Sequence, residues 1–306
     1  TKIKEYDLDN IKVDCVLNIK SNLGEGAIWS TIDQRLYWVD ITEGHFCNFN
    51  PQNGKNKIID IGKPIGCFAL KKNGNVIVAL TDGFFELNQH SKKMTLIKNT
   101  ESDILSNRFN DGTVDLNGRF YAGTMPINGP NIKSKPQGSL YCLNIDGTVK
   151  KTMDGFYTIN GLAFSPDGKI AYVSDSAYWV RTIWAYDYNL EDGIWLNKRI
   201  FYDTKNLAGR PDGGCIDADG CYWMAGVSGW ELVRITPQGK IDKIIKMPVE
   251  KPTKIAFGGT NLDIMYVTSI GIKGISKGTE KNQPDAGGIF ALSVPGVKGV
   301  EFPYYG

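Results

Sequence analysis

The chain repeats one short phrase six times, and this repeat constrains the fold more than any other feature. Each copy contains an opening residue, an apolar stretch, a tight turn, and a second apolar stretch rich in aromatic and β-branched residues. The copies begin 41 to 52 residues apart, at Glu25, Gly66, Asn110, Asn160, Asp212 and Lys254. A repeat of about 40 to 50 residues that holds four short strands is typical of propeller blades.

The turns lie at a constant offset, because in every copy after the first a turn residue follows the opening residue by seven positions. Four of these turns are dipeptides that accept the positive φ of a hairpin: Asn73-Gly74, Asn117-Gly118, Asp167-Gly168 and Asp219-Gly220. We therefore predict an all-β, six-bladed β-propeller with four-stranded antiparallel blades around a central metal-binding channel, as a single domain over residues 1–306. A β-sandwich or two stacked barrels would also have short strands, but neither explains the offset.

Ring closure is expected to join the two ends of the chain. Strands near 4–17 would complete the blade that contains residues 287–296, because an open ring would leave exposed sheet edges. Residues 127–136 are interrupted by Gly and Pro and predict a surface loop, which could act as a lid.

Composition excludes several classes of partner. The formal charge is only +2 and the lysines are scattered, which argues against nucleic acid. No apolar run reaches the length of a membrane span, and Thr1–Asn10 is polar where a signal peptide would be apolar. A leader removed before Thr1 is compatible with this composition. We expect a monomer with no membrane partner.

Cysteine and histidine usage points away from a zinc-type site. The six cysteines contain no CxxC pair, and the two histidines, His45 and His90, have no ligand-type neighbours at short spacing. Scattered cysteines of this kind are typical of buried apolar thiols and favour a reducing, cytoplasmic compartment.

The opening residues of the phrases should meet at one mouth of the channel, because the first strand of each propeller blade lines the axis. Glu25, Asn110, Asn160 and Asp212 would then gather two carboxylates and two carboxamides. Such hard oxygen ligands suit Ca²⁺, Mg²⁺ or Mn²⁺, and without a metal one carboxylate would tend to stay protonated. Asn-Gly and Asp-Gly are also turn dipeptides, but each phrase already has its turn. For Lys254 we expect an ordinary solvated lysine.

The sequence also resembles the family of senescence marker protein 30, gluconolactonase and luciferin-regenerating enzyme. The segments that carry the resemblance lie at 24–29, 107–125, 138–141, 160–176, 210–225 and 254–269, and NRFNDG and PDGGCIDADG are the most specific of them.

The resemblance implies a six-bladed propeller in which Glu25, Asn160 and Asp212 bind a divalent metal. Calcium is expected first, with Mn²⁺, Zn²⁺, Mg²⁺ or Fe²⁺ as alternatives. It places Asn110 close to the metal and Arg108 in contact with substrate. Residues 126–128 read Pro-Ile-Asn where relatives carry acidic residues, which leaves the particular lactone open.

We therefore expect a metal-dependent hydrolase that opens sugar-acid lactones, with Asp212 as general base or as nucleophile and with Arg108 and Asn110 holding the substrate. Neither histidine opens a repeat phrase, which argues against a serine or cysteine triad. Two alternatives stay open: a calcium-dependent phosphotriester or fluorophosphate hydrolase, and a non-catalytic propeller that serves as a binding module.

Overall fold

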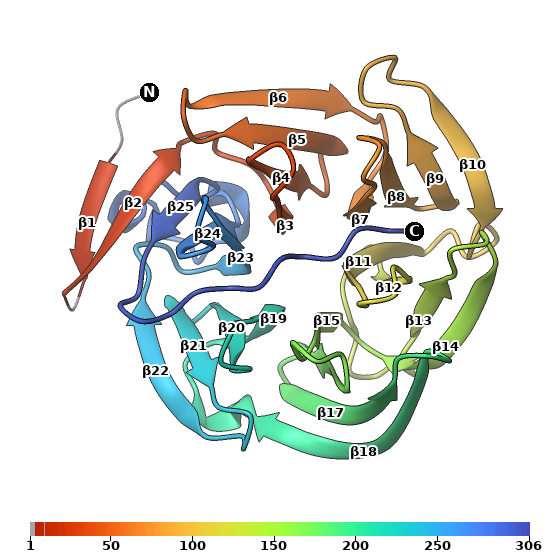
Figure 1. The fold of residues 1–306 in the computed structure, drawn as a ribbon. Helices are drawn as coiled ribbons and strands as arrows, with labels where there is room; N and C mark the ends of the chain where they lie inside the picture. The colour runs from red at the N-terminus through yellow and green to blue at the C-terminus, as the bar shows by residue number, and fades with distance from the viewer. Residues whose placement is uncertain (1–3, 9) are drawn as a thin grey trace.

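The computed structural model describes residues 4–8 and 10–306 and confirms the six-bladed β-propeller (Figure 1). Five blades are four-stranded and antiparallel, and each follows the chain from the axis outwards. Their strands are β3 (Gly24–Ser30), β4 (Arg35–Asp40), β5 (His45–Asn50) and β6 (Lys55–Asp60); β7 (Ile65–Leu70), β8 (Val76–Leu80), β9 (Gly83–Leu87) and β10 (Met94–Asn99); β11 (Asn107–Val114), β12 (Phe120–Pro126), β13 (Gly138–Leu143) and β14 (Val149–Phe156); β15 (Ile159–Phe164), β16 (Ile170–Asp175), β17 (Thr182–Asn189) and β18 (Ile194–Asp203); and β19 (Arg210–Ile216), β20 (Tyr222–Val227), β21 (Glu231–Ile235) and β22 (Ile241–Lys246).

The sixth blade joins the two ends of the chain, as predicted. It consists of β23 (Pro252–Gly258), β24 (Ile264–Ser269), β25 (Ile289–Leu292), β2 (Ile11–Leu17) and β1 (Lys4–Leu8). The N-terminal β2 pairs antiparallel with β25, so that Val13 lies opposite Leu292. This blade therefore has a fifth strand, β1, at its outer edge.

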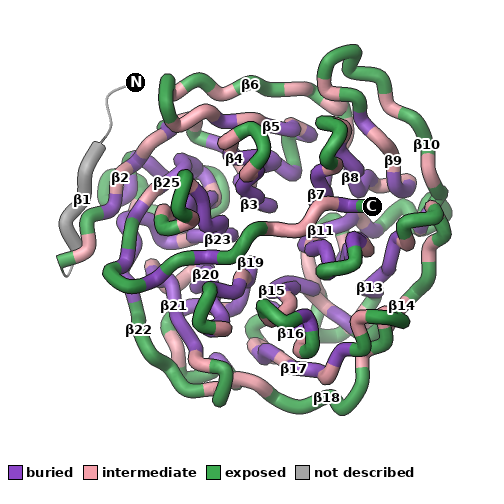
Figure 2. The backbone as a smooth tube through the Cα atoms, viewed as in Figure 1, coloured by how far each residue is buried: buried purple, intermediate pink, exposed green. Residues whose placement is uncertain are grey.

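Burial decreases from the axis to the rim (Figure 2). Every residue of β7 is buried, whereas β10 in the same blade has no buried residue. The hydrophobic core lies between adjacent blades: Phe84 of β9 and Phe109 of β11 pack with their ring centroids 5.0 Å apart. Inner strands are covered on both faces, which explains why every residue of β3, β7 and β23 is buried.

The hairpin turns lie where the sequence predicts them. Gly74, Gly118, Gly168 and Gly220 all have positive φ, between 71° and 88°. The preceding Asn or Asp does not share this positive φ. In two of the turns its side chain accepts a backbone N–H two residues on, from Asn75 N to Asn73 Oδ1 at 2.9 Å and from Lys169 N to Asp167 Oδ1 at 3.0 Å. Only the glycine of each dipeptide therefore needs the left-handed backbone.

The described part of the chain has three short 3₁₀ turns as its only helices, Thr204–Asn206, Ile272–Gly274 and Glu280–Asn282. None of the helices within residues 4–8 and 10–306 is long and apolar enough to cross a bilayer. Residues 127–136 form the predicted loop between β12 and β13, and Tyr157 donates its hydroxyl to the Ser134 carbonyl of this loop at 3.1 Å. Its action as a lid stays a prediction.

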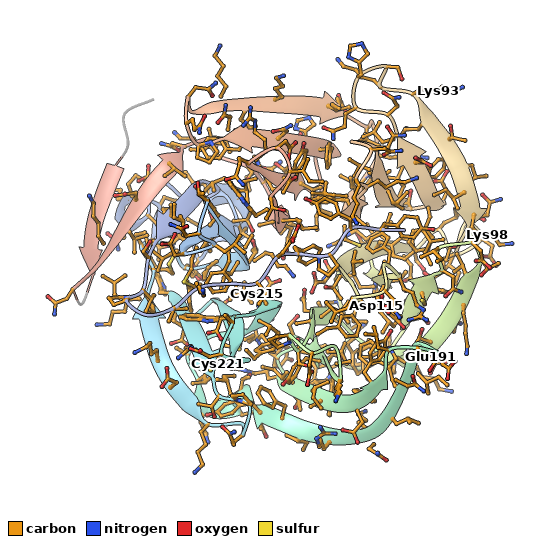
Figure 3. The ribbon with its side chains drawn as sticks, in the orientation of Figure 1. Lys93, Lys98, Asp115, Glu191, Cys215 and Cys221 are labelled. Atoms are coloured by element: carbon orange, nitrogen blue, oxygen red, sulfur yellow. The ribbon has the colours of Figure 1, made fainter. Side chains whose placement is uncertain are left out.

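All six cysteines are free thiols, and five of them are buried. Cys215 of β19 and Cys221 of the turn that follows belong to the same blade (Figure 3). Burial raises the pKa of the Cys47 and Cys215 thiols to about 12, so both stay protonated at neutral pH. These residues are apolar packing groups, as the sequence predicts.

Candidate metal and lactone site at the starts of the inner strands

A shift in strand register follows the start of every inner strand. In β3 the pairing with β4 shifts between Glu25 and Ile28, and in β15 the pairing with β16 shifts between Asn160 and Ala163. The other four inner strands have the same irregularity. Gly26 and Gly161 have positive φ, 67° and 63°. These glycines therefore serve β-bulges that redirect the neighbouring side chains, and they are not hairpin turns.

Hydrogen bonds join three of the predicted site residues. Asn110 donates from Nδ2 to the Asn160 Oδ1 at 3.2 Å and to the Ile159 carbonyl at 2.8 Å. Arg108 donates from Nη1 to the Asn110 Oδ1 at 3.0 Å. On the far side, Asn160 donates from Nδ2 to Ser176 Oγ at 2.8 Å, which turns its amide oxygen towards Asn110. The chain of contacts orients both carboxamides.

The two predicted carboxylates lie together and are almost fully buried, with Glu25 5% and Asp212 7% exposed. Burial raises the pKa of Glu25 well above its usual range, and the charge and hydrogen bonding of Asp212 raise it further. Burial likewise raises the pKa of Asp212, to about 6. The Asp212 Oδ1 has no hydrogen-bond partner among the described residues. Such a pair is costly unless a proton or a cation is added.

Arg108 lies within electrostatic reach of both acids. Its side chain is partly buried, and burial lowers the pKa of the guanidinium to about 10 while the charges of Glu25 and Asp212 oppose that change. Arg108 is therefore charged at neutral pH. Each of the predicted site residues is thus found in one group at the starts of β3, β11, β15 and β19.

Sequence reasoning missed Arg210 and Ser176. Arg210 donates from Nη1 to the Ser176 carbonyl and from Nη2 to Ser228 Oγ, both at 3.3 Å. Its positive charge opposes the rise in the pKa of Asp212 that burial causes. The sequence offers one signal, because Arg210 lies two residues before Asp212 at the start of the same inner strand. Ser176 follows β16 and carries no signal in the repeat.

The prediction for Lys254 is wrong. Its side chain is buried at 3% exposure, its Nζ donates to the Gly214 carbonyl at 2.9 Å, and Nζ lies 3.7 Å from the Asp111 Oδ1. An inner-strand lysine in a narrow channel cannot extend to solvent, so a backbone carbonyl and a carboxylate take the place of water. Asp111, which the sequence analysis also passed over, is buried at 4% exposure.

The residues at this mouth fit a hard divalent cation. Asp212 offers a buried oxygen without a hydrogen-bond partner, and a cation would relieve its repulsion with Glu25. Among the described residues no group of three His, Cys, Asp or Glu side chains is arranged for a metal. The set therefore depends on an amide oxygen, that of Asn160, besides its two carboxylates.

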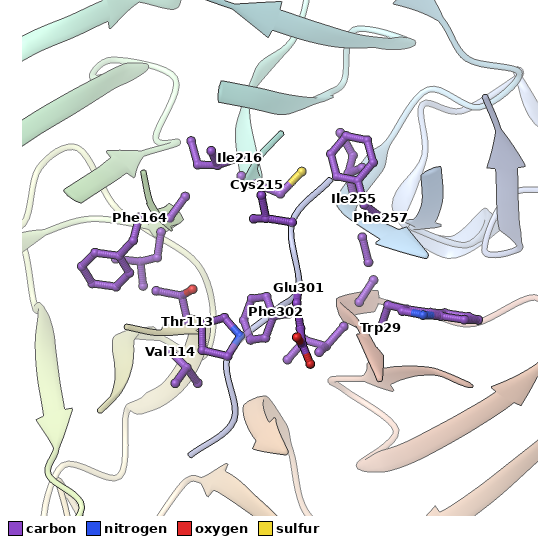
Figure 4. Close-up of a pocket in the computed structure, with 18 of the residues that line it drawn as sticks. Trp29, Thr113, Val114, Phe164, Cys215, Ile216, Ile255, Phe257, Glu301 and Phe302 are labelled. Atoms are coloured by element: carbon purple, nitrogen blue, oxygen red, sulfur yellow. The ribbon is translucent and has the colours of Figure 1, made fainter. Parts of the chain in front are cut away.

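The opposite ends of the same strands enclose an apolar cavity of about 80 Å³ (Figure 4). Its walls include Trp29, Phe164, Phe257 and Phe302. Lys254 also borders it, whereas the predicted site residues Glu25, Arg108, Asn110, Asn160 and Asp212 do not. The segment 299–306 crosses this end of the ring (Figure 1), where Tyr305 donates its backbone N–H to the Leu70 carbonyl at 2.8 Å. One end of the channel is therefore polar and the other apolar.

Comparison with known proteins gives a consistent family assignment. Residues 23–271 match the model of the SMP-30/gluconolactonase/LRE-like region. Regucalcin from Xenopus laevis is 37% identical over 295 residues, which cover 96% of this chain and 98% of that protein. A solved luciferin-regenerating enzyme is 28% identical with a TM-score of 0.88, covering 96% of this chain and 99% of that one. Regucalcin from Agrobacterium tumefaciens, a calcium-binding protein, has a TM-score of 0.89 at 24% identity, covering 95% and 96%.

Proposed function

The chain belongs to the SMP-30/gluconolactonase/LRE-like family, and from this premise we propose that it is a metal-dependent hydrolase that opens the lactones of sugar acids. The observation that carries the proposal is the Asp212 Oδ1, which is buried without a hydrogen-bond partner among the described residues and belongs to a carboxyl group that interacts with Glu25. Unsatisfied buried oxygens are costly, and they persist where a ligand or a reaction uses them.

Glu25, Asn160 and Asp212 would hold the cation. All three offer oxygen donors and none offers sulfur or imidazole, so Ca²⁺ is the expected ion. The hydrogen bond from Asn160 Nδ2 to Ser176 Oγ would keep the amide oxygen available for this role. When bound, such a cation supplies Lewis-acid polarisation of the lactone carbonyl.

The protein's own residues supply the proton transfers and the orientation of the substrate. Asp212 would take a proton from the water that attacks the carbonyl carbon, and the ring C–O bond then breaks with a proton returned to the leaving ring oxygen. The product is the open hydroxy acid. Arg108 would donate hydrogen bonds to substrate oxygens from its remaining N–H groups, while Asn110 keeps Arg108 and Asn160 in place.

Turnover of D-glucono-1,5-lactone and of a phosphotriester by the same preparation tests this function. The proposal predicts a much higher kcat/KM for the lactone. Faster turnover of the triester would favour the phosphotriesterase alternative, because a polarised P=O resembles a polarised C=O. No turnover of either substrate would favour the binding module.

A further inference from the structure

We infer that Lys254 is a resident counter-charge of the channel, which weakens the hold of the carboxylate cluster on a divalent cation. The inference rests on the metal site of the proposed function. It concerns an ammonium group that is buried beside these carboxylates and to which the proposed mechanism gives no role.

The backbone is shaped to admit this lysine. A Cβ atom added at Gly213, directly after Asp212, would lie 2.4 Å from the Lys254 Cδ and 2.6 Å from the Thr253 carbonyl oxygen. Only glycine leaves that space. The stem of Lys254 therefore passes beside the strand that carries Asp212, and its Nζ reaches the Gly214 carbonyl of the same strand. The ammonium group is thus built into the wall of β19.

Asp111 is the negative partner of Lys254. Its Oδ1 accepts the Gly112 N–H at 2.9 Å and its Oδ2 accepts the Leu162 N–H at 3.1 Å, so its carboxylate is held by β11 and β15 together. Lys254 Nζ lies 3.7 Å from the same Oδ1. These contacts engage both oxygens of Asp111 and separate its role from that of Asp212, whose Oδ1 has no such partner among the described residues.

Asp111 and Lys254 act on the proposed cation with opposite signs. Asp111 directly follows Asn110 in β11, and its Oδ2 accepts the N–H of Leu162, two residues after the proposed ligand Asn160, so its negative charge lies beside the proposed cation site. A positive charge beside Asp111 therefore offsets part of the field that attracts a cation to this mouth. Charges interact strongly in a buried channel, so removal of either one should change cation affinity measurably.

Calorimetric titration with CaCl₂ tests the inference without reference to catalysis. The wild type is compared with Lys254→Met, which keeps most of the length of the side chain without its charge, with Asp111→Asn, and with the double variant. We expect Lys254→Met to bind Ca²⁺ about tenfold more tightly and Asp111→Asn about tenfold more weakly, with the double variant near the wild type. Lys240→Met, at an exposed position, is the control and should bind as the wild type does.

The signs of the two changes decide the outcome. A merely structural role would weaken binding in both single variants, and weaker or unchanged affinity in Lys254→Met would overturn the inference. Lys254→Gln, which can still donate a hydrogen bond to the Gly214 carbonyl, replaces the Met variant if circular dichroism shows that the latter is unfolded. If the wild type binds no Ca²⁺, the metal site of the proposed function fails and the inference falls with it; if it binds and the signs do not differ, only the inference fails.

Discussion

Two buried aspartates at opposite ends of one inner strand are treated differently by the fold. Asp217, directly after β19, accepts hydrogen bonds from Trp223 Nε1 at 2.9 Å and Arg234 Nε at 2.8 Å, as well as from two backbone N–H groups. Asp212, near the start of β19, leaves its Oδ1 without a partner among the described residues. The aspartate at one end of the strand therefore has hydrogen-bond partners for both carboxylate oxygens, whereas within the described chain the aspartate at the other end does not.

The same contrast holds for the whole channel. At the end of the inner strands next to the hairpin turns, here called the turn end, aromatic side chains and the crossing segment 299–306 surround a small apolar cavity. At the other end, here called the bulged end, the bulged strands bring the carboxyl groups of Glu25 and Asp212 together. These two groups repel each other when both are charged. We infer that the turn end supplies stability, and we propose that the bulged end holds the reactive groups, at a cost in stability.

The sharpest test of this division is Asp212→Asn. Loss of the proposed base should reduce kcat/KM for the lactone by about 10²- to 10⁴-fold. Thermal unfolding of the metal-free protein should not shift to lower temperature, because the substitution removes a buried repulsion. Asp154→Asn, at an exposed position, is the matched control. Retention of most of the activity in Asp212→Asn would contradict the assignment.

Trp29→Ala probes the opposite end of the strands. Trp29 is 4% exposed and stacks on Tyr266 with a centroid separation of 5.5 Å, so truncation should cost about 3 to 5 kcal/mol of unfolding free energy. The kcat/KM of the folded fraction should not change. Denaturant unfolding and an assay at low temperature measure both quantities. A selective loss of activity with little loss of stability would contradict the assignment of stability to one end of the channel and of activity to the other.

Addition of calcium should stabilise the protein through the bulged end alone. At a free concentration 100 times the dissociation constant, the expected gain is about 2.7 kcal/mol, visible as a higher Tm after EDTA treatment and return of Ca²⁺. Glu25→Gln should lose most of this gain, whereas Glu191→Gln, at an exposed position, should keep it. An equal gain in the two variants would place the calcium elsewhere.

Arg108→Ala should raise KM for the lactone about tenfold and lower kcat by less, because the proposed contacts hold the substrate in both the ground and the transition states. Steady-state kinetics with a concentration series gives both constants. The reverse pattern, a large loss of kcat at constant KM, would assign Arg108 to the transition state.

Tyr305→Phe should have the smallest effect. The variant removes a hydrogen bond from the Tyr305 hydroxyl to the Asn144 carbonyl, which is 2.6 Å long and ties the crossing segment to the β13–β14 turn. We expect a loss of about 1 kcal/mol in unfolding free energy and no change in kinetics. Altered kinetics in this variant would show that the two ends of the channel are coupled.

The repeat predicts the blades because each copy contains one β-hairpin. The backbone preferences of the turn residues place the turn of that hairpin at the same offset in successive copies. The same regularity predicts that Glu25, Asn110, Asn160 and Asp212 lie together, since each opens an inner strand. Residues outside the repeat could not be found this way: Ser176 follows a second strand, and its contact with Asn160 depends on how a loop turns. The burial of Lys254 depends on the space left by Gly213, which no pattern in a single sequence reveals.

The measurement that tests the central claim most directly is hydrolysis of D-glucono-1,5-lactone and D-xylonolactone, followed by pH indicator with spontaneous hydrolysis subtracted, before and after EDTA and with single metals added back. The account predicts that EDTA abolishes turnover and that Ca²⁺ or another single divalent ion restores it. Turnover that survives EDTA unchanged, or no turnover with any metal, would contradict it.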